Sequence, residues 1–145
     1  MEDYAYISQL IKQCIIAELG CSDYKMDEEN NFISFTYQDI SYVCFYDAKE
    51  PFYLRIMIPN IDTFDINIDN SRTFLQILKM NTQFKTGKFI IVENVLWIAA
   101  EVMLTGTTRI TKTFYALVNL LLHMRSEYAT YINNISKEEN KNDHE

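Results

Sequence analysis

The chain has 145 residues, of which 48% are hydrophobic and 23% are charged, and its formal net charge at pH 7 is −7. This composition predicts an ordinary globular protein that buries its core without disulfides or metal ions. The acidic balance and the lack of a basic stripe argue against binding to nucleic acid or to an anionic membrane. The three cysteines, Cys14, Cys21 and Cys44, fit no metal-binding spacing and favour a reducing, cytoplasmic location.

The first half of the chain predicts one helix followed by three strands. Apolar residues recur at steps of three and four from Tyr4 to Ile15, which indicates a helix that ends near Gly20. An acidic, asparagine-rich loop is expected from Cys21 to Asn31. Three runs rich in β-branched and aromatic residues then predict antiparallel strands joined by hairpins. These runs are Phe32–Tyr37, Ile40–Tyr46 and Phe52–Ile58.

The second half predicts a helix, two more strands and a final helix. Pro59 is expected to end the third strand, and Asp69 or Asn70 is expected to cap the next helix. The apolar face of that helix is expected to hold Phe74, Ile77, Leu78 and Asn81. Gly87 permits a turn into the fourth strand, and the last two strands are expected at Lys88–Glu93 and Val95–Leu104.

The final helix has the strongest helical periodicity in the chain, and Thr107 or Thr108 is expected to cap it. Its expected apolar face holds Ile110, Phe114, Leu117, Val118, Leu121, Tyr128, Ile132 and Ile135. The element order is therefore α-β-β-β-α-β-β-α, which predicts one α+β domain over residues 1–136. Its sheet should be mainly antiparallel and five-stranded, with the helices packed on one face. Residues 137–145 are expected to form a disordered, charged tail.

Four short segments carry a resemblance to known proteins: Leu78–Asn81, Gly87–Phe89, the strand through Trp97, and Gly106–Thr108 before the last helix. With this element order, the chain resembles proteins of the type III secretion chaperone-like fold. Within that fold it is similar to the YbjN-like group of small bacterial proteins. The resemblance implies a homodimer that binds other polypeptides without catalysing a reaction, and a sensory or regulatory role.

Two alternatives stay open beside this interpretation. One is a dedicated secretion chaperone for an effector, because such chaperones are also small and acidic and hold an extended effector segment on their surface. The other is a small-ligand-binding or enzymatic domain whose site assembles from distant residues.

Local sequence patterns predict no catalytic, cofactor-binding or metal site. The loop Asp65–Asn70 resembles the start of a calcium loop, but Asn70 and Gln76 replace the glycine and glutamate that an EF-hand needs. His123 has only Glu127 one turn away, which is typical of a surface ion pair. The acidic group of Glu18, Asp23, Asp27, Glu28 and Glu29 is typical of a solvated loop.

The candidate site is one face of the sheet. In the last strand, Leu96, Ile98, Ala100, Val102 and Leu104 are expected to face the helices. The alternate positions carry tryptophan, methionine, tyrosine and arginine, a composition typical of protein interfaces. The candidate contact residues are Trp97, Met103, Tyr53 and Arg55. An ordinary half-exposed sheet face remains the alternative, because a shift of one residue would exchange the two sets.

Overall fold

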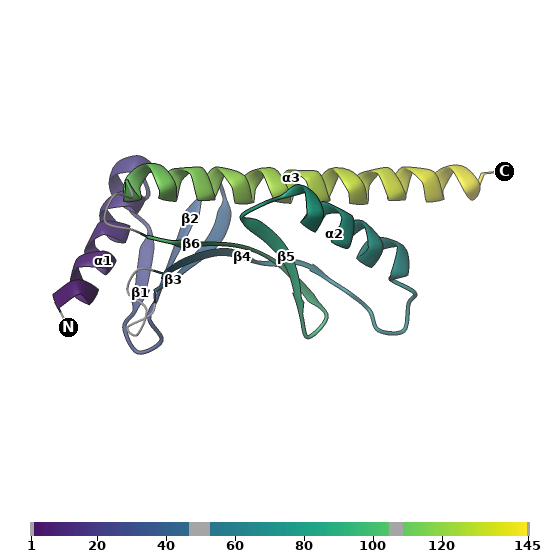
Figure 1. Cartoon of the computed structure of the whole chain (residues 1–145). Helices are drawn as coiled ribbons and strands as arrows, with labels where there is room; N and C mark the ends of the chain where they lie inside the picture. The colour runs from purple at the N-terminus through teal and green to yellow at the C-terminus, as the bar shows by residue number, and fades with distance from the viewer. Residues whose placement is uncertain (1, 47–52, 105–108, 145) are drawn as a thin grey trace.

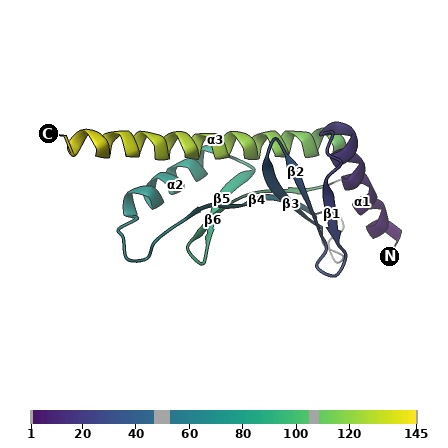
Figure 2. The same ribbon diagram turned by 180° about the vertical axis from the view of Figure 1, so that it is seen from behind.

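The computed structural model describes residues 2–46, 53–104 and 109–144, with side chains from residue 8 onward. These residues form an antiparallel sheet of strand order β1-β2-β3-β4-β6-β5, with the helices on one side of it (Figure 1). The longest helix, α3 (Ile110–Asn142), lies along the whole sheet, and a view from behind shows the same arrangement (Figure 2). The predicted α+β class is confirmed, but the described part of the chain has six strands, not five.

The additional strand lies in the segment expected to be an acidic loop. Helix α1 (Glu2–Gln13) continues into one π-helical turn, η1 (Cys14–Glu18), and the chain reverses after Gly20, whose φ is 68°. Strand β1 (Tyr24–Asp27) then pairs with β2 (Phe32–Tyr37). Tyr24 and Met26 pack against the core, whereas Lys25 and Asp27 alternate with them on the other face.

The central strands are β3 (Ile40–Tyr46) and β4 (Tyr53–Thr63). Both β2 and β3 have the predicted bounds, whereas β4 continues through Pro59, which was expected to end it. The ladder between β4 and β6 shifts register between Ile58 and Asp62. Proline is tolerated at such an irregularity because its missing N–H is not needed for pairing there.

Helix α2 (Ser71–Gln83) precedes the hairpin of β5 (Gly87–Val92) and β6 (Val95–Met103). Asp69 stabilises the start of α2, because its Oδ1 accepts hydrogen bonds from the Ser71 N–H and hydroxyl at 2.9 and 2.5 Å. Ile77 and Met80 are buried, but Leu78 is 62% exposed, so its predicted place on the apolar face is wrong. Successive helix positions are about 100° apart, and the face centred on Ile77 and Met80 leaves Leu78 outside.

Helix α3 covers the core side of the sheet with its buried face. Its buried positions are Phe114, Leu117, Val118, Leu121, Met124 and Tyr128, so the prediction missed only Met124. The expected caps Thr107 and Thr108, and Gly106, lie outside the described residues. The helix also runs through Lys137 to Asn142, where a disordered tail was expected. Most side chains there are exposed, and helix-forming glutamates and lysines continue the helix without core contacts.

Gly87 allows α3 to approach the sheet closely. A Cβ at this position would collide with the Met124 side chain, which is itself fully buried. Helix-on-strand packing therefore favours glycine at this position. The turn that was expected at Gly87 is wrong, because Gly87 is the first residue of β5 and, among the described glycines, the positive φ belongs to Gly20.

Candidate functional site

Register defines the side of the sheet that faces away from the core, here called the outer face. Tyr53 lies opposite Met103, Arg55 opposite Glu101, and Ile90 opposite Trp97. Because alternate side chains share a face, all of these residues point the same way. The apolar members of the outer face are Phe32, Val43, Phe45, Tyr53, Met57, Ile90, Val92, Val95, Trp97, Ala99 and Met103.

The outer face is a second apolar layer, separate from the core. The core cluster and its partly buried neighbours contain alternate positions of the same strands, such as Leu54, Ile56 and Ile98, and none of the outer-face residues. Among the described residues, the helices pack on the core side (Figures 1 and 2). Met57 and Ala99 are nevertheless buried on this face, at 5% and 6% exposure.

One ion pair lies near the middle of the outer face. Arg55 Nε is 2.5 Å from Glu101 Oε1, and its guanidinium carbon is 5.9 Å from the centre of the Tyr53 ring. The two charged side chains remain 43% and 42% exposed. Burial raises the pKa of the Tyr53 hydroxyl, and Glu101 contributes to the increase. The group offers an aromatic ring, a guanidinium and a carboxylate to a polypeptide that lies across the strands.

The four predicted contact residues lie on this one face but in two places. Met103 is 63% exposed and lies opposite Tyr53, so these two residues and Arg55 are neighbours. Trp97 is half-buried and lies further along β6, opposite Ile90. Met103 lies six positions after Trp97, or about 20 Å along the strand at the usual rise per residue.

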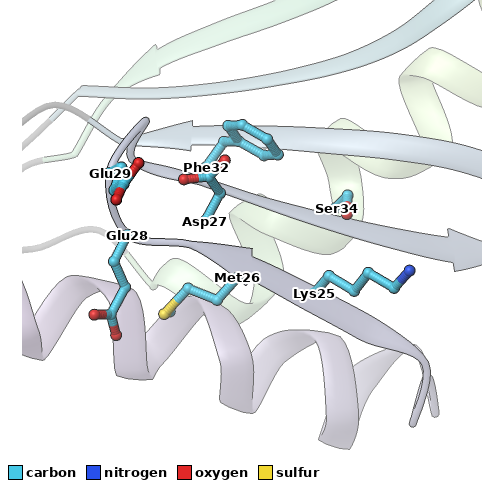
Figure 3. Close-up of a pocket in the computed structure, with 7 residues that line it drawn as sticks. All are labelled: Lys25, Met26, Asp27, Glu28, Glu29, Phe32 and Ser34. Atoms are coloured by element: carbon cyan, nitrogen blue, oxygen red, sulfur yellow. The ribbon is translucent and has the colours of Figure 1, made fainter.

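The outer-face residues of β2 and β3 were not among the predicted contact residues. The rings of Phe32 and Phe45 have centroids 5.7 Å apart. Beside them lies a hollow of about 620 Å³ at the β1–β2 turn (Figure 3). Its lining residues are Lys25, Met26, Asp27, Glu28, Glu29, Phe32 and Ser34. The alternation of Phe32, Ser34 and Thr36 could have placed Phe32 on this face.

The β5 edge of the sheet is closed at one residue by a side chain. The side-chain Nδ2 of Asn81 donates to the Phe89 carbonyl at 2.9 Å, and the side-chain Oδ1 of Asn81 accepts from the Phe89 N–H at 2.7 Å. The Asn81 side chain thus bonds both backbone groups that an added strand would use at this position. Lys88 Nζ donates to the carbonyls of Asn81 and Phe84, which fixes the end of α2 against the same strand. Such closure protects an edge strand from pairing with another chain.

A third apolar surface lies on and before α2. Leu75 and Leu78 are 60% and 62% exposed, and Ile66 and Ile68 in the preceding loop are 76% and 62% exposed. Leu75 and Leu78 are three positions apart and therefore share one side of the helix. This surface was not predicted, because Leu78 was expected on the apolar face of α2.

The candidate metal-binding and nucleophilic groups of the described residues are bonded to neighbours or buried. Oxygens of the Asp65–Asn70 loop are used within the loop, where Asp65 Oδ1 accepts from the Asn67 N–H and the Asn70 amide donates to the Ile68 carbonyl. Within the described ranges, no group of three or more histidine, cysteine, aspartate or glutamate residues could hold a metal ion. Cys14, Cys21 and Cys44 are free and buried, and burial raises the pKa of Cys14 to about 11.

A smaller hollow of about 270 Å³ lies between the end of β4 and α3. Tyr128 donates to Asp62 Oδ2 there at 2.6 Å, so the most buried polar group of the hollow already has a partner. Where the structure describes the chain, none of its helices has the length and apolarity needed to cross a membrane.

Comparison with known proteins defines the fold. No protein-family model and no curated protein sequence matches the chain. Among solved structures, it is similar to the type III secretion chaperone SycH of Yersinia pestis, determined in complex with a stable fragment of YscM2. The TM-score is 0.60 at 12% sequence identity, and the match covers 84% of this chain and 98% of that chain. The chain therefore has a secretion chaperone-like fold.

Proposed function

We propose that this protein is a non-enzymatic, polypeptide-binding module that holds an extended segment of a partner against its outer face. The observation that carries the proposal is the apolar layer on that face. This layer lies outside the core, and none of the described helices covers it. Most of its residues are half-buried and Met103 is 63% exposed, so part of this apolar surface is open to a partner. Exposed apolar surface is typical of interaction sites in soluble proteins. The chaperone-like fold, found in a protein solved with a polypeptide bound, supports the same function.

A dedicated secretion chaperone has more support than a YbjN-like regulator. The similarity to SycH supports the chaperone alternative, whereas no family model supports membership of the YbjN-like group. We retain the cytoplasm as the proposed location, because three buried free cysteines suit a reducing compartment.

Binding would combine apolar burial with one polar clamp. Partner side chains that cover Met103 and Tyr53 would gain about 25 cal/mol for each Å² of apolar surface removed from water. Arg55 and Glu101 would orient the segment, because their charged groups remain partly exposed and can bond its backbone. Trp97 would provide a second anchor about 20 Å along β6.

The closed edge of β5 favours binding across the face over extension of the sheet at that edge. An added strand would have to displace Asn81 from both backbone groups of Phe89. The opposite edge, β1, has only four residues. Addition of a strand to a sheet edge draws its affinity from a row of main-chain hydrogen bonds, and neither edge offers a long free row.

We propose that the protein is a homodimer and that α2 provides the contact. Leu75 and Leu78, together with Ile66 and Ile68, form its most exposed aliphatic surface among the described residues. Size-exclusion chromatography with light scattering tests this, with Leu75→Ser/Leu78→Ser as the variant expected to be monomeric. A wild-type monomer at micromolar concentration would contradict the dimer without affecting the proposed binding face.

The binding face is tested with a labelled peptide in which leucine and phenylalanine alternate with serine. Met103→Lys should weaken binding about tenfold, because it places a charge where an apolar side chain is expected to pack. Tyr115→Lys is the matched control, because it adds the same charge at a side chain that is 44% exposed on α3, away from the outer face. Equal affinity of the two variants would contradict the proposal. A thermal-shift screen with metals, nucleotides and metabolites tests the small-ligand alternative.

A further inference from the structure

The β1–β2 end of the outer face differs from its centre in charge. Register places Asp27 opposite Phe32 and Lys25 opposite Ser34, so these four residues share the outer face. The hollow of about 620 Å³ lies at this end. Figure 3 shows Asp27 beside the Phe32 ring, Glu29 at the turn, and Met26 and Glu28 on the side of β1 toward α1.

Aromatic rings form the apolar part of this region. Phe32 lines the hollow, and the centroid of its ring is 5.7 Å from the ring centroid of Phe45 on the neighbouring strand. Both side chains are half-buried and neither belongs to the core cluster. The pair therefore offers a partner side chain an apolar contact that is continuous with the rest of the outer face.

Carboxylates outnumber cations around the hollow, with three acidic residues and one lysine in its lining. Asp27 stays ionised because the side-chain and backbone N–H groups of Asn30 donate to it at 2.9 and 3.0 Å, which lowers its pKa. Glu28 and Glu29 are exposed, and within the described residues no ion pair neutralises either of them. The region has the negative potential that attracts lysine and arginine.

We infer that this hollow receives a large apolar residue of the partner segment that is flanked by lysine or arginine. The inference rests on the proposed function and specifies the chemistry of its partner. The aromatic pair would contact the apolar side chain, and the surrounding carboxylates would pair with the flanking cations. Charge complementarity selects a partner with cationic flanks over one with acidic flanks, because juxtaposed like charges are repulsive.

A second copy of the chain is disfavoured as the occupant. In a two-fold symmetric dimer the same patch contributes from both subunits, so residues near the axis meet their own copies. Asp27, Glu28 and Glu29 would then lie near the same three carboxylates. The net charge of −7 adds repulsion between copies at long range.

Two peptides test the inference. They share leucine and phenylalanine at alternate positions and carry lysine or glutamate at the positions between them. We expect the lysine peptide to bind at least tenfold more tightly at low ionic strength. Salt should reduce this preference, because the Debye length falls from about 10 Å at 0.1 M to about 3 Å at 1 M.

Net charge alone would also favour the lysine peptide, so the decisive comparison uses two variants of equal charge. Glu28→Gln/Glu29→Gln should weaken binding of the lysine peptide about fivefold. Glu127→Gln/Glu139→Gln makes the same change in net charge on α3 and should alter binding less than twofold. All four glutamates are exposed, so both variants are expected to fold.

The outcomes separate this inference from the proposed function. Equal effects of the two double variants would overturn the inference. If the serine peptide then still bound and Met103→Lys still weakened it, the proposed function would stand. If none of the three peptides bound the wild-type protein, both would be overturned.

Discussion

The two faces of the sheet show how one strand can serve two purposes. On β6, Ile98 and Ala100 have no exposed surface and belong to the core beneath the helices. Met103, on the opposite face of the same strand, is 63% exposed and belongs to a layer that no described helix covers. Under the proposed function, stability depends on the core-facing positions and recognition on the alternate ones, so single substitutions should separate them.

The largest expected effect comes from substitution of a core-face residue. Ile98→Ala should reduce the free energy of unfolding by about 2–5 kcal/mol, because it removes buried methyl groups and leaves a cavity. Met103→Ala should change it by less than about 0.5 kcal/mol, because its side chain is already exposed. Urea denaturation measures both values, and similar losses would mean that the faces do not divide these roles.

The next largest effect is expected at Gly87, where α3 approaches the sheet. Gly87→Ala should destabilise the protein by about 1–3 kcal/mol, because the new methyl group must displace the buried Met124 side chain. The double variant with Met124→Ala should lose less stability than the sum of the two single losses, because the smaller side chain makes room for the new methyl group. A double-mutant cycle measures this difference. Strict additivity would show that the two positions do not touch.

Substitution of Asn81 at the β5 edge should lower the free energy of unfolding by a comparable amount and should also change self-association. Asn81→Ala leaves the N–H and carbonyl of Phe89 without their partners and should cost about 1–3 kcal/mol. It should also promote self-association, because the edge strand becomes free to pair. Denaturation and light scattering measure the two effects. Thr82→Ala, at an exposed neighbour on α2, is the control and should show neither.

The smallest effect is expected at the start of α2, which supports neither face directly. Hydrogen bonds from the side chain and backbone of Ser71 lower the pKa of Asp69 below its ordinary 3.8. A lowered pKa contributes stability above the ordinary value, and this is lost as the pH falls through the folded-state value. Asp69→Asn should therefore be slightly less stable at pH 7, and the difference should shrink below about pH 4. Urea midpoints at both pH values check this, and a constant difference would contradict it.

Most of the fold could be predicted because its patterns are local. Alternation places β2 and β3 correctly, and periodicity places nearly all of the buried face of α3. Strand β1 was missed because two of its four residues are charged, and only pairing with β2 makes it a strand. The extension of β4 past Pro59 depends on a register shift against β6, which is distant in the sequence.

The candidate site could be predicted in part for the same reason. Alternation within β4 and β6 places Tyr53, Arg55, Trp97 and Met103 on one face, as the register confirms. Their role in binding remains a proposal. The pairing of Phe32 with Phe45 follows from the short hairpin between β2 and β3, so local alternation could have found it. The contact of Asn81 with Phe89 depends on how α2 packs beside β5, which no local pattern encodes.

The most direct test of the central claim uses the intrinsic fluorescence of Trp97, the only tryptophan in the chain. Trp97 is half-buried on the outer face, so a bound peptide should cover it and shift its emission to shorter wavelength. The account predicts that this shift saturates at the same peptide concentration as binding measured with the labelled peptide. Saturable binding that leaves the Trp97 emission unchanged, with Met103→Lys binding as tightly as wild type, would contradict the claim that the outer face is the binding surface.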